Sequence, residues 1–474
     1  MLPTVNNYAI YPSVIPADQS VEMIIAPTER TYLLFEGEEY TVTVYHVNGD
    51  EPNYHNSTAM ETVTLTAHNG VLRFNFTFPE EQEHLVQLWK DEKKLQEFSV
   101  YSLYEDLYKL TPLRGDFHGH SHRSDGRHDP AALAGHYREQ GYDFFSLTDH
   151  NRYYPGAEID EVYSGVKLGI TRVPGEEVHA PGSVLHIVHV GGKKSVTMEY
   201  IHNREVFEAE VAEYKEKLLA ERPSLPENYH DRYAKAMWAT DKIHEAGGIA
   251  IFAHPYWRPK DHIYNAHDKL AKELITSGMF DAYELIGGMK QIGINRSIAL
   301  WSDLRAEGLR LPVVGSSDVH NVEKAWSFPN LFTVCFAKSN TPDDIIDAVK
   351  QGLSVAVEAS GYEYDRQYRA YGSLRLVSYA QYLLTHFFPL QQRICQGEGV
   401  AMRAYAMNDA DAALIESQVA QTLKFRSRFF GQEAPRLPDT DMLAFEDRVR
   451  ARHVAEGPIT KGSAVDSDKI NRQI

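Results

Sequence analysis

The sequence predicts an α/β protein, in which a unit of alternating strands and helices follows a small all-β sandwich. Three observations predict this fold class. Short segments of alternating apolar and polar residues occupy positions 1–108, short strands alternate with helical stretches over 113–358, and a helical pattern continues over 359–474. We therefore expect three regions with these bounds, the last of which is a helical extension with a flexible tail after about Gly457.

The first region is predicted to be a β-sandwich because its apolar residues recur with a period of two. Turn residues at Asn48-Gly-Asp and Asn69-Gly70 separate these segments, as expected between short antiparallel strands. The predicted strands lie at 21–25, 40–47, 62–66 and 71–78.

The second region alternates strands and helices, which predicts a parallel sheet or a barrel with its functional groups at the C-terminal ends of the strands. A charged segment at 195–235 interrupts the alternation. We expect this segment to be a solvated helical insertion, with a lid or an interface arm as alternatives. The predicted strands are 143–148, 249–253, 282–286 and 311–315, and the predicted helices are 131–140, 231–246, 294–307 and 342–351.

Composition narrows the classes of partner and ligand. The chain of 474 residues carries 66 acidic and 48 basic residues, a net charge of −18, which argues against a nucleic-acid partner. Two cysteines provide neither a disulfide framework nor a thiolate zinc site, which leaves histidine and carboxylate as metal ligands. The first residues do not resemble a signal peptide, and no apolar run is long enough to span a bilayer, so we expect a cytoplasmic protein with no membrane partner.

Histidine and carboxylate residues gather in motifs that follow the predicted strands. His118 and His120 alternate along one strand, so their side chains share a face and can share a metal ion. A polar turn with Asp125 follows them. Further candidates lie downstream in the segments 148–150, 175–177, 185–186, 253–255 and 317–320.

This ordered set resembles the PHP (polymerase and histidinol phosphatase) superfamily of metal-dependent hydrolases. The resemblance covers about positions 113 to 325, and its motif blocks lie at 116–126, 146–150, 251–255 and 314–320. Gly175-Glu-Glu177 and His186 complete the pattern. The resemblance implies a distorted seven-stranded (β/α) barrel that binds two or three divalent cations, with Zn, Mn or Fe as candidates.

The resemblance also implies which side chains hold each cation. The first cation would be bound by His118, His120, Glu177 and Asp318; the second by Glu177, His186 and His254; the third by Asp125, His150 and His320. Glu177, Asp318 and His254 would act in catalysis. Glu176 competes with Glu177, and His189 competes with His186, as alternative ligands. We interpret His122, His128, His179, His189 and His262 as structural or solvent-exposed residues by default, and Asp149 as a residue that orients a neighbouring ligand.

These observations and the resemblance favour a phosphoesterase that acts on a small phosphorylated substrate through a metal-bridging hydroxide. Arg152 and Arg258 are candidate substrate-binding residues because a guanidinium recognises phosphate or carboxylate, and Tyr256 and Trp257 are candidate neighbours. Two alternatives remain open: a carboxylester, carbamate or amide hydrolase of the same superfamily, and a non-catalytic metal-stabilised binding protein. The sequence makes no prediction about the oligomeric state.

Overall fold

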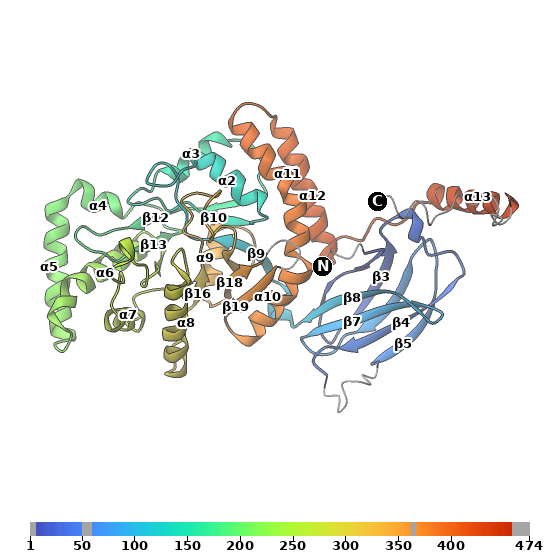
Figure 1. Cartoon of the computed structure of the whole chain (residues 1–474), viewed down its shortest axis with the longest axis horizontal. Coiled ribbons are helices and arrows are strands. Elements are labelled where there is room, and N and C mark those ends of the chain that lie inside the picture. The colour runs from blue at the N-terminus through green and yellow to red at the C-terminus, as the bar shows by residue number, and fades with distance from the viewer. Residues whose placement is uncertain (1–5, 50–58, 362–365, 457–474) are drawn as a thin grey trace. The chain divides into compact units, whose positions relative to one another are not determined.

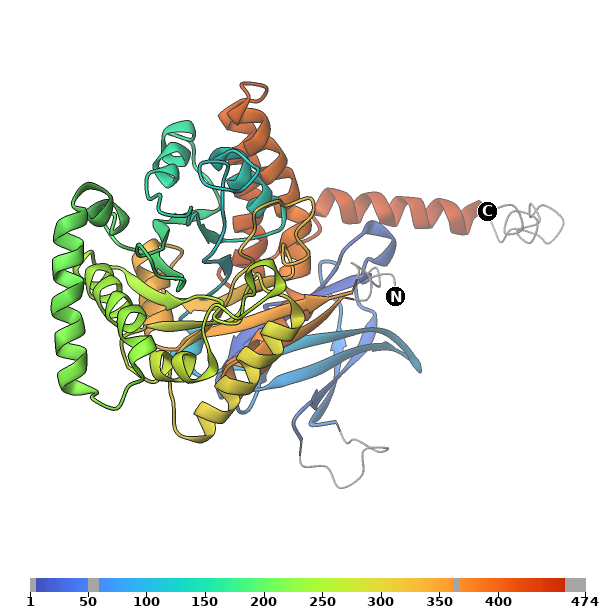
Figure 2. The ribbon, with the colours of Figure 1, turned by 60° about the vertical axis from the view of Figure 1, so that its left-hand side comes forward.

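The computed structural model describes residues 6–49, 59–361 and 366–456, and these form two compact units. Within these ranges, residues 103–361 and 366–427 belong to the site unit, and residues 6–49, 59–102 and 428–456 belong to the β unit. Figures 1 and 2 show the strands and helices of both units from two directions. The predicted tail after Gly457 lies outside the described residues.

The β unit consists of two sheets that share one hydrophobic core. One sheet has the strand order β1-β3-β6 and the other β2-β8-β7-β4-β5. Apolar side chains alternate along the strands, and Ile25 and Phe74 of the first sheet pack with Val42 and Val86 of the second. The strands are β1 (Tyr8–Tyr11), β2 (Val14–Pro16), β3 (Ser20–Pro27), β4 (Glu39–His46), β5 (Glu61–Thr66), β6 (Leu72–Thr77), β7 (Glu83–Lys90) and β8 (Lys93–Leu103).

The site unit also contains two sheets, with the strand orders β11-β10-β9-β17-β18-β19 and β12-β13-β14-β15-β16. Their strands are β9 (Thr111–Asp116), β10 (Phe144–Ser146), β11 (Thr171–Val173), β12 (Gly175–Val178), β13 (Ile187–Val190), β14 (Ile249–Phe252), β15 (Ala282–Ile286), β16 (Val313–Gly315), β17 (Leu331–Ala337), β18 (Ser354–Ser360) and β19 (Gln367–Tyr371). Several of these strands are buried along their whole length, as expected for a sheet covered on both faces.

Both sheets of the site unit mix parallel and antiparallel strands, whereas the sequence pattern predicted parallel ones. β9, β10 and β11 are parallel neighbours, and so are β14, β15 and β16. β13 runs antiparallel to β12 and β14, and β17 runs antiparallel to β9. The reason at β13 is the short connection of residues 179–186, because a parallel connection requires a longer crossover.

The two sheets of the site unit are linked at two places. The Thr333 hydroxyl of β17, an inner strand of its sheet, donates to the carbonyl of Gly315 in the edge strand β16 (2.8 Å) and accepts from its amide (3.0 Å). The edge strands β11 and β12 are separated in the chain only by Pro174. The observed architecture is thus a mixed α/β arrangement of two linked sheets.

Helices surround these sheets, and the four predicted ones are confirmed with ends shifted by a few residues. They are α2 (Pro130–Glu139), α6 (Glu227–Glu245), α8 (Gln291–Ala306) and α9 (Pro342–Lys350). Asp129 caps α2 by accepting from the amides of Ala131 (2.9 Å) and Ala132 (3.3 Å), and Pro130 begins the helix.

The charged segment 195–235 contains α4 (Thr197–His202), α5 (Arg204–Glu221) and the start of α6. The other helices of the site unit are α1 (Glu105–Tyr108), α3 (Pro155–Val162), α7 (Asp268–Ile275), α10 (Leu374–His386), α11 (Phe388–Ala406) and α12 (Ala412–Phe429), while α13 (Thr440–Glu456) belongs to the β unit. Across the described ranges, no helix combines the length and the apolar character needed to cross a membrane.

Candidate metal centre

The predicted ligands come from loops and strand ends that lie at the same end of the strands in both sheets of the site unit. His118 and His120 follow β9, His150 follows β10, His254 follows β14, and Asp318 follows β16. His186 precedes β13, but because β13 runs antiparallel to its neighbours, its N-terminus lies at this same end. The mixed topology therefore brings all nine predicted ligands into one cluster.

Glu177 lies at the centre of this cluster, with its side chain fully buried on β12. Its Oε1 faces His186 Nδ1 (2.8 Å) and His254 Nε2 (3.2 Å). Its Oε2 faces His118 Nε2 (3.4 Å) and His120 Nε2 (3.5 Å). The two carboxylate oxygens thus face different sets of imidazoles, since His150 and His179 also lie near Oε2. A carboxylate placed in this way can bridge two cations.

Asp318 provides the second carboxylate of the inner cluster. Its Oδ1 lies 3.0 Å from His120 Nε2 and 3.4 Å from His118 Nε2, and its Oδ2 lies 3.9 Å from His254 Nε2. The backbone at Asp318 has a φ of 50°, and that at His254 has a φ of 22°. Residues other than glycine rarely adopt such backbone angles. The fold therefore stores backbone strain at two of the candidate ligands, as functional sites commonly do.

A third group of ligands lies at the more exposed rim of the cluster. Asp125 Oδ1 lies 3.2 Å from His320 Nε2 and 3.4 Å from His150 Nε2. The Asp125 side chain is 58% exposed, whereas that of His120, which belongs to the same group, is buried. This rim group matches the set that the sequence assigned to a third cation.

Backbone hydrogen bonds join the loops that carry the ligands. The amide of His120 donates to the carbonyl of Val319 (2.8 Å), and the amide of Asp318 donates to the carbonyl of His118 (2.9 Å). The amide of Asn151 donates to the carbonyl of Glu177 (2.9 Å). The strand ladders therefore continue into the loops and hold the ligands rigidly.

The side chains of the cluster fit divalent cations. Within the described residues, many of its buried polar atoms approach one another without meeting hydrogen-bond geometry, which is costly unless another group satisfies them. The imidazole and carboxylate set suits Zn, Mn or Fe. The atoms concerned are His118 Nε2, His120 Nε2, His150 Nδ1, Glu177 Oε2, His179 Nε2, His186 Nδ1 and Asp318 Oδ1.

The electrostatics of the cluster favour positive charge. Burial by itself raises the pKa of Glu177, but the charges on His118 and His186 outweigh burial and hold this pKa well below its usual value. Burial likewise opposes the charged form of His150, but the nearby carboxylates of Asp125 and Glu177 raise its pKa to about 10. Bound cations would supply this positive charge while leaving the imidazole nitrogens deprotonated as ligands.

Two buried carboxylates that the sequence analysis missed support the inner ligands. Glu284 on β15 accepts from His118 Nδ1 (2.8 Å), which directs His118 Nε2 toward Glu177. Asp116 at the end of β9 accepts from the amides of His118 and Ser317 (both 3.1 Å). The signal for Glu284 was its position as a charged residue in an otherwise apolar strand.

Asp149 holds the loop that carries Asp125. Its carboxylate accepts from the amide (2.9 Å) and the hydroxyl (2.7 Å) of Ser121, and from the hydroxyl of Ser124 (2.5 Å). These bonds fix the turn from which Asp125 extends toward His150 and His320.

The structure separates Glu176 from Glu177. Glu176 points to the opposite face of β12, where it accepts from His189 Nδ1 (3.1 Å) and from the amide of Val196 (2.5 Å). It also pairs with the hydroxyl of Thr197. Glu176 and His189 thus fasten the start of the insertion to the sheet, and the cluster uses Glu177 and His186.

His179 is an addition to the cluster, because the sequence analysis interpreted it as structural or exposed. Its Nε2 lies 3.4 Å from Glu177 Oε2, and its ring stacks on that of His186 with a centroid distance of 3.7 Å. His179 follows Glu177 by two residues, so strand alternation places both on one face. The spacing of two residues from Glu177 was the feature of the sequence that could have identified His179 as a ligand.

The candidate substrate residues lie at different places. The Arg152 side chain is exposed two positions after His150, and within the described residues no hydrogen bond or ion pair joins it to the cluster. Arg258 directs its guanidinium to the carbonyl of His262 (3.3 Å) and to the ring of Tyr264. Trp257, which lies between Tyr256 and Arg258 in the chain, has its ring centroid 5.7 Å from that of His186 and 6.1 Å from that of His254.

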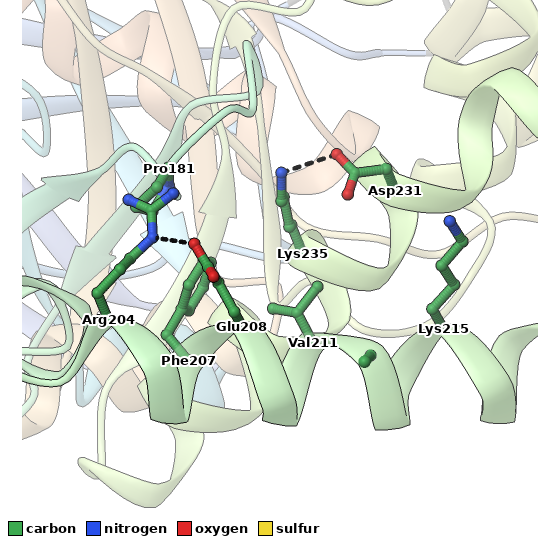
Figure 3. Close-up of a pocket in the computed structure, with 9 residues that line it drawn as sticks. Pro181, Arg204, Phe207, Glu208, Val211, Lys215, Asp231 and Lys235 are labelled. Carbon is green, nitrogen blue, oxygen red and sulfur yellow. Dashed lines mark hydrogen bonds and ion pairs between the residues drawn. The ribbon is translucent and has the colours of Figure 1, made fainter.

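A separate pocket of about 220 Å³ lies beside the insertion helices α5 and α6 (Figure 3). Phe207 and Val211 line it together with two ion pairs, Arg204–Glu208 and Lys235–Asp231. None of the predicted site residues lines this pocket, so it is distinct from the cluster.

Comparisons with known proteins find only distant likenesses. No family model matches the chain, and neither does any curated protein. Among solved structures, the chain is similar to a two-domain protein from Bacteroides vulgatus described as containing a PHP-like metal-dependent phosphoesterase, with 21% identity, a TM-score of 0.35, and coverage of 54% of this chain and 66% of that chain. The match therefore spans just under two thirds of the Bacteroides protein.

Two further solved structures are similar over a smaller share of this chain. One is a metal-dependent phosphoesterase from Bifidobacterium adolescentis, with 18% identity, a TM-score of 0.30, and coverage of 44% of this chain and 87% of that chain. The other is an amidohydrolase from Chromobacterium violaceum with bound sulfate, with 18% identity, a TM-score of 0.31, and coverage of 44% and 89%. Because these likenesses are distant, the function proposed below rests on the geometry of the cluster.

Proposed function

We propose that the chain is a metal-dependent hydrolase that cleaves a phosphate ester of a small molecule. The observation that carries this proposal is the position of Glu177, whose two buried oxygens face different sets of imidazoles. A carboxylate placed in this way can hold two cations close together. Cations so paired lower the pKa of coordinated water toward neutrality and offset the charge of a leaving oxygen.

The roles of the side chains follow from their positions. Glu177 would bridge the inner cations, with His118, His120 and Asp318 on one side and His186 and His254 on the other. Asp125, His150 and His320 would hold a third cation at the rim, where a substrate enters. Arg152 is the candidate contact for the part of the substrate that extends into solvent. Arg258 remains a proposed substrate contact because its guanidinium can recognise phosphate or carboxylate.

We further propose that the two sheets of the site unit form a distorted (β/α) barrel, as the resemblance to the PHP superfamily implies. The two links between the sheets, through Thr333 and through Pro174, support this arrangement. The position of the cluster at the strand ends supports it as well, because barrel enzymes place their active sites there.

Turnover assays test the proposed function. The purified protein, loaded in turn with Mn, Zn or Fe, would be given aryl phosphate monoesters and diesters, and in parallel carboxyl and carbamoyl esters. We expect phosphate release that a chelator abolishes and added cation restores. Glu177→Gln should lower the rate by a factor of at least about 1000, because the bridge between the cations is lost.

Glu158→Gln is the matched control, since it removes a partly exposed carboxylate on α3 that pairs with Arg123 outside the cluster. Ester or carbamate turnover without phosphate release would replace the proposal by the amide or carbamate hydrolase. Bound cations without turnover of any substrate would favour the metal-stabilised binding protein.

A further inference from the structure

His150 lies between two groups of candidate ligands and faces each with a different ring nitrogen. Its Nε2 lies 3.4 Å from Asp125 Oδ1, in the rim group. Its Nδ1 lies 2.6 Å from Glu177 Oε2, where this buried nitrogen has no partner in hydrogen-bond geometry within the described residues. The ring is therefore placed to serve either group.

His179 completes the second of these groups. Its Nε2 lies 3.4 Å from Glu177 Oε2, is buried, and has no hydrogen-bond partner within the described residues. Its ring centroid lies 4.4 Å from that of His150. One ligand atom from each of His150, Glu177 and His179 lies within 4.8 Å of the others, a span that a single cation can join.

The fold holds His179 in this position through its backbone. The amide of His179 donates to Asn151 Oδ1 (3.1 Å), which also accepts from the hydroxyl of Tyr200 on α4. Asn151 adopts a φ of 52°, a conformation that asparagine tolerates better than most residues. A histidine fixed in this way differs from an ordinary surface histidine, whose side chain is free to move.

We propose that His179, His150 and Glu177 form an alternative position for the third cation, distinct from the rim position at Asp125. This inference rests on the proposed function, because it assumes that the inner cations are bound. A neutral imidazole binds a cation through one nitrogen and carries its proton on the other. Binding through His150 Nδ1 therefore excludes binding through His150 Nε2, and the chain holds three cations, with the third in one position or the other.

Metal binding to four variants tests the proposal without any activity measurement. Equilibrium dialysis of the full chain against Co²⁺, followed by elemental analysis, would be applied to Asp125→Ala, His179→Ala, the double variant, and His202→Ala. His202 is an exposed histidine at the end of α4, which makes His202→Ala the matched control.

We expect three cations in the wild type, the control and each single variant, but only two in the double variant. Each single substitution should lower the affinity for the third cation by a factor of about 10 to 100. The Co²⁺ absorption spectrum of the third equivalent should differ between the single variants, because different ligand atoms hold the cation. These are His150 Nδ1, His179 and Glu177 in the alternative position, and His150 Nε2, His320 and Asp125 at the rim. Retention of the first two cations shows that the variants are folded.

The proposal is overturned if the wild type holds only two cations, if Asp125→Ala alone reduces the count to two, or if the double variant still holds three. Each of these results leaves the proposed function intact, because the inner pair remains. A wild type that binds no cation would instead contradict the proposed function itself.

Discussion

Six imidazole nitrogens lie within 3.5 Å of the carboxylate oxygens of Glu177. A buried carboxylate with so many nitrogen neighbours cannot satisfy all of them through hydrogen bonds, because it offers about four lone-pair positions. Cations shared among these atoms would satisfy both the oxygens and the nitrogens. At the residue scale, cation binding at this centre therefore depends on the burial of the Glu177 side chain.

Glu284 is expected to position His118. Replacement of Glu284 by Gln should weaken cation binding by a factor of about 10 to 100, because the amide holds His118 less strongly in the orientation that directs Nε2 to the cluster. Dialysis against Mn²⁺ measures this change. Glu323→Gln, at an exposed position, is the control. Unchanged affinity in Glu284→Gln would show that the surrounding packing alone orients His118.

His84 makes the stability of the β unit depend on pH. Burial, with a smaller contribution from His46, lowers the pKa of His84 to about 4, and its Nε2 lies 2.9 Å from the Ser102 hydroxyl. An unfolded histidine titrates near 6.5, so the unfolded state binds the proton more readily. The contribution is fully present above pH 6.5 and is lost as the pH falls toward 4, by about 3 kcal/mol at most.

Thermal unfolding of the full chain at several pH values checks this expectation. His84→Gln should show a smaller loss of β-unit stability between pH 6.5 and 4 than the wild type. His68→Gln, an exposed histidine of the same unit, should show the wild-type slope. Equal slopes in all three proteins would rule out His84 as the titrating group.

At the scale of the elements, a buried ion pair attaches α11 to α2 within the site unit. Arg138 on α2 donates through Nε to Glu398 on α11 (2.6 Å), and Glu398 also accepts from the amide of Gly169 (2.7 Å). Both side chains are buried. α11 is thus joined to α2 and to the segment at Gly169 through polar groups that depend on each other.

Glu398→Ala should lower the free energy of unfolding of the site unit by about 3 kcal/mol, because the buried Arg138 guanidinium loses its closest carboxylate and keeps only Asp143, at 3.6 Å. The double variant Arg138→Leu/Glu398→Leu should lose less than the sum of its two single variants. Denaturant unfolding followed by circular dichroism measures the cycle. Additive losses would contradict a direct coupling between the two side chains.

At the scale of the whole molecule, the candidate ligands all belong to one of the two compact units. Because bound cations stabilise only the unit that holds them, removal by a chelator should lower the unfolding temperature of the site unit. A free cation concentration of 100 times the dissociation constant would raise the free energy of unfolding of the site unit by about 2.7 kcal/mol. The transition of the β unit should not move.

Differential scanning calorimetry with and without a chelator distinguishes the two transitions. Protein denatured and refolded without cations, then given Mn²⁺, should recover the higher transition. A chelator that shifts the transition of the β unit, or that shifts neither transition, would contradict the assignment of the cluster as a cation site.

Local patterns predicted eight of the strands and four of the helices. Helices such as α6 and α9 follow from apolar periodicity, and the Thr341 side chain caps α9. The nine candidate ligands follow from the resemblance of the ordered motifs to the PHP superfamily. Glu284 and His179 were missed because a lone acidic residue or histidine has no pattern of its own, and its partners lie far away in sequence.

The sequence by itself determined the succession of strands and helices and the residues that supply imidazole and carboxylate groups, because both depend on short-range order. Only the tertiary structure decided which nitrogen faces which oxygen. The antiparallel direction of β13 brings His186 to the shared end of the strands, and strand alternation separates Glu176 from Glu177. Such choices depend on pairing between distant segments, which burial and hydrogen bonding settle only when the chain is folded.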